Sequence, residues 1–319
     1  MVSVAAGRRD HDGLNALKMI RTQCAICDTD AWDRLLYETT LDFKRLSFEC
    51  FSARRIPDRV HYRTVVCRKC GLIRADPILS DCELERLYGA STFTYEREAP
   101  YTLKTYARYF REILHLTPDK SRLLEIGCGN GFFLAEALAC GFTEVYGVEP
   151  SSAAVEQASP LVRGGIQVGV LKNGLFPDGH FSMICGFQVL DHVADPNVTL
   201  SLCRRLLRPG GLAFFIHHDA GAWTHRFLGE SSPIFDVEHV YLFNRSTVRR
   251  IFIKNGFQSL RVFPVANTYP LYYWFHLMPL PSVIKQAFLP RLRASSLGGM
   301  AVRLRAGNLG IVARRGDDA

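Results

Sequence analysis

The chain has 319 residues, of which 48% are hydrophobic and 22% are charged, as is typical of a folded globular protein with one large or two modest domains. The formal net charge of +8 favours an anionic partner, such as a nucleic acid, a phosphorylated substrate or a membrane surface, without selecting among them. The first twenty residues contain two arginines, two aspartates and no apolar run. We therefore expect no signal peptide and a cytoplasmic protein.

Two CxxC pairs, Cys24–Cys27 and Cys67–Cys70, lie in the first eighty residues. In a reducing compartment such spacing favours a metal site over disulfides. Each pair can place two thiolates on one metal, and two pairs complete a tetrahedral site with no open position. We predict a structural Zn²⁺ site in a module over residues 1–80. The alternative is a set of redox-active or merely buried cysteines.

Two helices are predicted next, and together they form a helical linker region over residues 81–116. The first is expected to start at a Ser80 or Asp81 cap and to stop at Gly89. The second covers residues 102–116, where apolar and aromatic residues recur at helical spacing. The sequence Thr-Pro-Asp that follows breaks it.

From residue 117 to 319, short apolar runs alternate with helical patterns. Seven runs are expected as strands, at residues 122–126, 144–149, 166–170, 181–187, 211–218, 257–265 and 308–315. Helices are expected between them, at residues 132–140, 151–159, 196–207 and 245–256. This alternation predicts an α/β fold with a Rossmann-like, seven-stranded and mostly parallel sheet covered by helices on both faces.

Residues 269–289 form an apolar stretch long enough to suggest a membrane span. Three prolines interrupt it, and His276 and Lys285 lie within it, which makes a spanning helix costly. We expect a buried or interfacial segment. From Lys285 to Arg315 the chain is basic and has no acid. That region could receive a phosphorylated acceptor, lie on a membrane surface, or equally be a solvated face.

A glycine-rich loop follows the first strand of the predicted sheet. Residues 123–131 read LLEIGCGNG, which is E-x-G-x-G-x-G rather than the dinucleotide pattern G-x-G-x-x-G. Glycines allow close backbone approach to a ligand, and Glu149, at the end of the second strand, can bind both ribose hydroxyls. Glu125 suits a cation. S-adenosylmethionine (SAM), an adenosyl sulfonium with an amino-acid tail, fits this set, whereas a plain strand-to-helix turn is the alternative.

Four segments in order resemble the motifs of class I SAM-dependent methyltransferases: LLEIGCGNG, VYGVEPS, FSMICGFQVLDHVADP and RRLLRPGG. The resemblance implies SAM as the cofactor. The third strand ends without the acid that contacts the adenine amine in many relatives. Backbone groups near Val170 and Leu171 are therefore expected to make that contact. The expected cofactor-binding residues are Glu125, Gly127, Cys128, Gly129, Asn130, Gly131, Glu149, Pro150, Val170, Leu171, Phe187 and Gln188.

The cysteine module carries a second resemblance. CxxC…CRKCGLIRADP, followed by ELERLY and a methyltransferase core, is similar to zinc-containing sugar C-methyltransferases of antibiotic deoxysugar pathways. It is also similar to methyltransferases associated with cell-surface polysaccharide synthesis. These resemblances imply a small-molecule or glycan acceptor, including a nucleotide sugar.

Methyl transfer often requires a base at the acceptor, and histidine is the usual candidate. His192 is expected to begin a helix after the fourth strand. His217 and His218 end the fifth strand and point to opposite faces. The pair Glu238–His239 matches an acid-histidine pair that is catalytic in the sugar C-methyltransferases, which also implicate a tyrosine, here Tyr95.

We predict that His239 acts as general base or as hydrogen-bond partner of the attacking atom, with Glu238 steadying its ring or raising its pKa. The alternative is a histidine that only fixes a lid. Two other functions stay open: an RNA methyltransferase and a non-catalytic SAM-binding protein. The sequence shows no cluster of aromatic and basic residues that would bind single-stranded RNA. No DNA partner is expected.

Overall fold

The computed structural model describes residues 17–42, 48–51, 59–91, 99–278 and 280–316. Its centre is a seven-stranded sheet in the order β12-β13-β10-β9-β6-β7-β8. Pairing of β13 with both of its neighbours is antiparallel, and the other pairs are parallel. The predicted Rossmann-like sheet is thereby confirmed. The strands are β6 (Arg122–Ile126), β7 (Glu144–Glu149), β8 (Ile166–Val168), β9 (Phe181–Phe187), β10 (Leu207–His218), β12 (Phe257–Pro270) and β13 (Ala301–Arg315).

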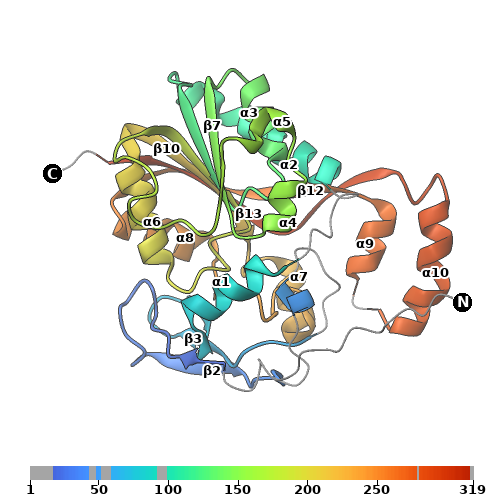
Figure 1. Ribbon diagram of the computed structural model, residues 1–319. Helices are drawn as coiled ribbons and strands as arrows, with labels where there is room; N and C mark the ends of the chain where they lie inside the picture. Colours follow the sequence, from blue (N-terminus) through green and yellow to red (C-terminus); the bar gives the residue numbers. More distant parts are fainter. Residues whose placement is uncertain (1–16, 43–47, 52–58, 92–98, 279, 317–319) are drawn as a thin grey trace, which may run out of the picture.

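Helices cover both faces of this sheet (Figure 1). On one face lie α2 (Ala99–Ile113), α3 (Phe132–Ala139), α4 (Ser152–Glu156) and α5 (Pro160–Arg163); on the other lie α6 (Pro196–Leu206) and α8 (Arg245–Lys254). Side chains of β10 alternate between two hydrophobic cores, as strand geometry requires. Phe214 packs in the core of α2 and α3, whereas Phe215 contacts Phe252 of α8 with ring centroids 5.6 Å apart.

The N-terminal part forms two small sheets. Strand β1 (Met19–Ile20) pairs with β5 (Ile78–Leu79). The second sheet has the order β11-β4-β3-β2, formed by β2 (Asp33–Tyr37), β3 (Thr64–Cys67), β4 (Ile73–Ala75) and β11 (Tyr241–Leu242). Strand β11 therefore joins the C-terminal half of the chain to the cysteine module. The predicted boundaries at residues 80 and 116 stay predictions.

The linker helices form close to their predicted positions. After the 3-10 helix η1 (Phe48–Phe51), helix α1 (Asp81–Gly89) follows its N-cap Ser80 and ends at the predicted glycine. The second helix, α2, begins three residues earlier than predicted and continues into the 3-10 turn η2 (Leu114–Leu116).

The expected helix start at His192 is wrong. This residue lies in a turn after β9, and α6 begins only at Pro196. The reason is local, because the carboxylate of Asp195 accepts hydrogen bonds from the backbone N–H groups of Asn197 and Val198 and so caps the helix at that point.

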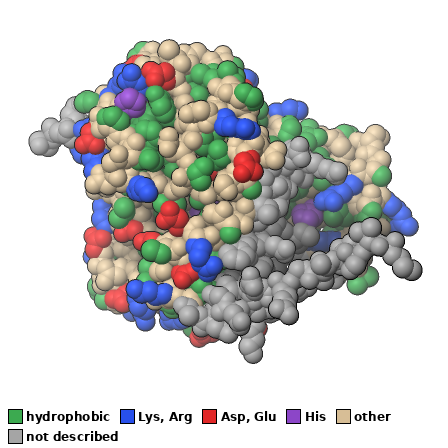
Figure 2. Space-filling model, in the orientation of Figure 1, with side chains coloured by type: hydrophobic (Ala, Val, Ile, Leu, Met, Phe, Trp, Pro, Cys, Tyr) green, Lys and Arg blue, Asp and Glu red, His purple; other side chains and the backbone are tan. Residues whose placement is uncertain are grey.

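The C-terminal apolar stretch becomes part of an arm, residues 271–304, that projects from the body (Figure 1). Strands β12 and β13 continue to pair as far as Pro270 and Ala301, and α9 (Leu271–Leu277) and α10 (Ser282–Ala294) lie between them in the chain. Figure 2 shows basic and hydrophobic side chains on the visible face of this arm. None of the described helices, which also include α7 (Trp223–Leu228) and the 3-10 helix η3 (Gly229–Ser231), is long and apolar enough to cross a membrane.

Candidate functional site

The glycine loop links β6 to α3 and has a backbone that only glycine adopts easily. Gly127, Gly129 and Gly131 have φ angles of +67°, +54° and +71°, in the left-handed region. A Cβ atom on Gly127 would lie 2.7 Å from Val189 Cγ2, so side chains are also excluded by contact. The loop therefore leaves room for close approach of a ligand to the N-terminus of α3.

Glu149 braces this loop from the end of β7. Its Oε2 accepts a hydrogen bond from the Gly129 N–H at 2.8 Å, and its Oε1 accepts one from the Ser151 N–H at 2.9 Å. Burial raises the pKa of this carboxyl group, while the two hydrogen bonds act in the opposite direction. Glu149, the residue predicted to bind the ribose, thus lies where the loop and the end of β7 meet.

Three buried side-chain oxygens near the loop have no hydrogen-bond partner among the described residues: Glu125 Oε2, Asn130 Oδ1 and Gln188 Oε1. Burial, followed by the charge of Glu149, raises the pKa of Glu125 well above its usual range. Unpaired buried acceptors are costly and indicate a donor-rich ligand. SAM has such donors in its ammonium and hydroxyl groups, so the residues present fit this cofactor.

Two other predicted cofactor-binding residues, Phe187 and Cys128, have buried side chains. The Phe187 ring is core, stacked on Tyr106 at 4.3 Å and edge-on to Phe133 at 4.6 Å between ring centroids. Cys128 is only 2% exposed and burial raises its pKa, so it offers its backbone rather than a thiolate.

The remaining cofactor predictions fall at the ends of β7 and β8. Pro150 follows Glu149 directly, and Val170 and Leu171 come just after β8, whose Val168 pairs with Glu149. These three residues therefore lie beside the acid that braces the loop.

A cluster of histidines surrounds a buried acid at the same edge of the sheet. Asp191, at 0% exposure, follows β9, and its Oδ2 accepts hydrogen bonds from His218 Nδ1 at 2.5 Å and from the His218 N–H at 3.2 Å. His192 Nε2 lies 3.8 Å from Asp191 Oδ1. Burial alone would raise the pKa of Asp191, but the neighbouring imidazoles hold it well below its usual range.

His239 joins this cluster from the segment before β11. Its ring centroid lies 4.4 Å from that of His218 and 4.9 Å from that of His192. Its Nδ1 donates to the Ile234 carbonyl at 2.8 Å, which leaves Nε2 as a proton acceptor. Burial, then the charges of His218 and His192, lower the pKa of His239 well below the usual range, so the imidazole is neutral at physiological pH.

The acid beside these rings is Asp191, and His239 Nδ1 donates its hydrogen bond to the Ile234 carbonyl. That Glu238 steadies the ring stays a prediction. The predicted Tyr95 lies outside the described residues. Another tyrosine, Tyr88 of α1, places its hydroxyl 2.9 Å from His192 Nδ1, and burial raises its pKa.

Sequence reasoning gave no role to Asp191 or Tyr88 and did not select His218. The strand order could have indicated two of these residues. Asp191 follows β9 and His218 ends β10, and because these strands are parallel neighbours, the two residues lie at the same edge of the sheet. His217 points away as predicted, since it is fully buried with its ring edge-on to Phe243.

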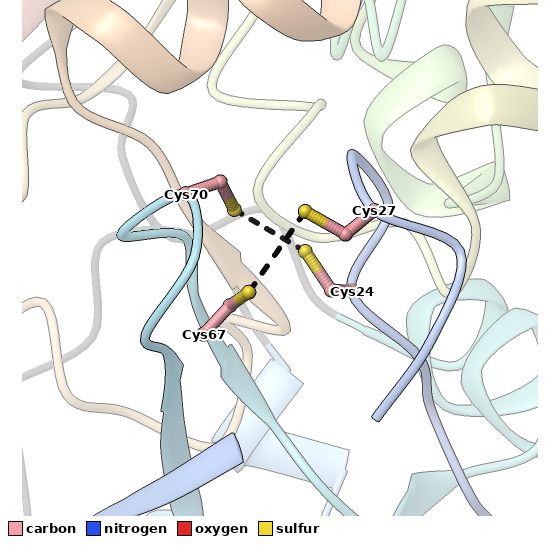
Figure 3. A group of neighbouring side chains, drawn as sticks. All are labelled: Cys24, Cys27, Cys67 and Cys70. Carbon is pink, nitrogen blue, oxygen red and sulfur yellow. Dashed lines mark hydrogen bonds between the residues drawn. The ribbon is translucent and has the colours of Figure 1, made fainter. Parts of the chain in front are cut away.

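The four predicted cysteines converge (Figure 3). Cys24 Sγ lies 3.3 Å from Cys70 Sγ, Cys67 Sγ lies 4.0 Å from Cys27 Sγ, and all four sulfur atoms are within 4.8 Å of one another. The backbone N–H of Leu72 points to Cys70 Sγ at 3.4 Å. Two tight turns bring the thiols together, and Gly71, at φ +80°, closes the second of them.

The cysteine module is bound to the segment that carries His239. Strand β11 pairs with β4, and the Ala75 N–H donates to the Val240 carbonyl at 2.8 Å. The Val240 N–H in turn donates to the Asp191 carbonyl at 2.7 Å. Residues next to His239 thus link the cysteine module to the buried acid of the histidine cluster.

Among the described residues, a second group, Asp191, His218 and His239, also has one ligand atom each within 4.8 Å of one another. Asp191 and His218 are already joined by a short direct hydrogen bond. We therefore interpret this group as an acid–base cluster.

The sheet order, the glycine loop and the acid of β7 define a SAM-dependent methyltransferase. A family described as "Methyltransferase domain" matches residues 95–262, more than half of the chain. The chain therefore belongs to this methyltransferase family, and α2 and the whole glycine loop lie inside the match.

Individual relatives match over shorter lengths. The chain is 36% identical over 98 residues to "Ubiquinone biosynthesis O-methyltransferase" of Rhizobium johnstonii, covering 29% of this chain and 39% of that protein. It is 34% identical over 116 residues to the protein of the same name from Caulobacter sp. strain K31, covering 33% and 44%. The chain thus spans less than half the length of these relatives.

A solved structure, an S-adenosylmethionine dependent methyltransferase from Mesorhizobium loti, is similar with a TM-score of 0.45 and 18% identity. The similarity covers 67% of this chain and 100% of that one.

Replacing Glu149 is expected to weaken SAM binding. In Glu149→Ala the brace on the loop and the acceptor for the ribose hydroxyls are both lost, and calorimetry should show affinity lower by about tenfold or more. Glu144→Gln is the control, since Glu144 lies at the other end of β7 and bonds Arg122 and Tyr146. Equal affinity in Glu149→Ala and the wild type would rule out this pose.

Removing the charge of Asp191 is expected to lower the histidine pKa values further. Its negative charge favours the protonated rings of His192 and His239, so Asp191→Asn should shift both titrations to lower pH. Titration of the ring signals by NMR measures this directly. Asp178→Asn, at an exposed site paired with Arg205, is the control. An upward shift, or none, would contradict the electrostatic role of Asp191.

Proposed function

We propose that this enzyme transfers the methyl group of SAM to an oxygen of a small-molecule or glycan acceptor. The observation that carries the proposal is the group of three imidazoles around buried Asp191, at the same edge of the sheet as the glycine loop. A hydroxyl group is a poor nucleophile until its proton is removed, and the neutral imidazole of His239 can accept that proton.

His239 is the residue we place at the acceptor. Its Nδ1 is held by a carbonyl, so its Nε2, which has no hydrogen-bond partner among the described residues, can take the acceptor proton. Asp191, through its negative charge, stabilises the imidazolium that results. When bound, SAM supplies an activated methyl whose bond to sulfur breaks as the new bond to oxygen forms. The histidines therefore serve to orient and deprotonate the acceptor.

The names of the relatives support oxygen as the receiving atom, since both similar proteins from Rhizobium johnstonii and Caulobacter are O-methyltransferases. The basic charge keeps RNA as a second candidate. Incubation with methyl-labelled SAM and a panel of phenols, nucleotide sugars and RNA tests the proposal. Label in RNA alone, or SAM binding with no transfer to any class, would overturn it.

We propose that the four cysteines bind one structural Zn²⁺. Four thiolates at about 2.3 Å from a tetrahedral zinc lie about 3.8 Å from one another. Two of the observed separations, 3.3 and 4.0 Å, lie on either side of that value. A four-cysteine site is closed, so the metal would hold the module together and would take no part in the chemistry.

Replacing His239 is expected to separate chemistry from cofactor binding. His239→Ala should bind SAM with wild-type affinity while methyl transfer slows about 10²–10⁴-fold, the usual contribution of a general base. His115→Ala, at an exposed position outside the cluster, is the control. A smaller loss accompanied by weaker acceptor binding would show that His239 only fixes a lid. Transfer at the wild-type rate would remove it from the mechanism and make His192 the next candidate.

Removing the metal is expected to damage the acceptor side more than the SAM side, because β4 supports the segment around His239. Wild-type protein should contain about one zinc per chain, and Cys67→Ser should lose zinc, folding yield and transfer rate. Cys140→Ser, a half-buried cysteine outside the group, should change none of these. Full stability of metal-free wild-type protein would contradict a structural zinc.

A further inference from the structure

The arm, defined here as residues 271–304, carries an unusual share of the exposed hydrophobic surface. Fifteen large hydrophobic side chains are exposed among the described residues, and seven of them lie between residues 278 and 304. Val283 and Phe288 of α10 are 73% and 57% exposed. Exposed apolar side chains that are scattered singly need no explanation, but their concentration in one projecting segment indicates a binding surface. The seven are Met278, Val283, Ile284, Phe288, Leu297, Met300 and Leu304.

The charged residues that neighbour these side chains in the sequence are all positive. No aspartate or glutamate occurs from residue 239 to 316, whereas the arm and the residue after it carry five basic side chains. Four of the five are exposed, and in Figure 2 no acidic side chain lies on the visible face of the arm. They are Lys285, Arg291, Arg293, Arg303 and Arg305, of which Lys285 is half-buried.

The arm begins at the edge of the sheet that holds the histidine cluster. His218, the last residue of β10, pairs with Asn308 of β13. Beyond that point β12 and β13 continue as a two-stranded ribbon, from Asn267 opposite Leu304 to Pro270 opposite Ala301. The surface of the arm is therefore on the side of the molecule where the acceptor is expected.

Hydrogen bonds fix the base of the arm. Trp274 Nε1 donates to the Val302 carbonyl at 2.9 Å, and the Leu271 N–H donates to the Met300 carbonyl at 2.9 Å. The Arg293 guanidinium lies over the Tyr272 ring at 5.3 Å. These contacts tie α9 and the start of β13 together and hold the apolar side chains of α10 away from the hydrophobic cores of the body.

We propose that the arm docks on an anionic membrane surface. Apolar side chains enter the boundary between headgroups and acyl chains, while arginine and lysine side chains bury their stems and bind phosphates. A second copy of the chain fits less well, because a two-fold interface would place the cations of one arm against those of the other. Charge complementarity thus selects lipid over self-association.

Vesicle binding tests the proposal. The full chain should sediment with vesicles of equal phosphatidylglycerol and phosphatidylcholine, bind phosphatidylcholine vesicles far more weakly, and lose binding as salt concentration rises. Val283→Glu with Phe288→Glu should weaken binding to the anionic vesicles about tenfold or more, because both apolar contacts are replaced by repelled charges. Arg291→Gln with Arg293→Gln should weaken it and flatten the salt dependence.

The matched control is Leu161→Glu, which puts one charge on a side chain that is 69% exposed on α5. It should bind vesicles as the wild type does. All variants should keep wild-type affinity for SAM, so failure of docking is distinguishable from failure of the proposed methyl transfer. Two results would overturn the proposal: equal vesicle binding by wild type and the glutamate variant, or a wild-type dimer that the glutamate variant dissociates in light scattering.

Discussion

Strand β11 is only two residues long, and a strand that short does not hold its position alone. It is held by β4, whose Arg74 is buried and bonded to both carboxylate oxygens of Asp33 at 2.7 and 2.5 Å. The paired guanidinium and carboxylate fix β4 within the cysteine module. Since His239 lies two residues before β11, the position of the histidine cluster depends on a strand supplied by the other end of the chain.

The second constraint is the charge of Asp191. A carboxylate at 0% exposure is costly unless its oxygens find donors or cations. The imidazole and backbone N–H of His218 supply donors, and the rings of His192 and His239 stand close by. Burial at the same time disfavours protonation of His239. The cluster thus combines the neutral imidazole of His239 with one negative charge that stabilises this ring when it takes a proton.

Local patterns predicted the sheet well, because each apolar run and each glycine loop is readable within a few residues. The loop at residues 127–131, its acid Glu149 and the four cysteines are all of this kind. The bond between Asp191 and His218 was harder, since it joins residues 27 positions apart through strand order. The pairing of β11 with β4 cannot be recognised from the sequence of either strand. The sequences of β12 and β13 also do not show whether these strands extend beyond the sheet.

The β4–β11 pairing joins a strand that is synthesised early to one that is synthesised late. Residues 73–75 are made long before residues 241–242, so the outer edge of β4 has no partner strand while most of the α/β domain is being synthesised. An open strand edge is a template for wrong pairing. The nascent cysteine module therefore exposes that edge to other strands during synthesis, and its sheet is complete only after β10 has been made.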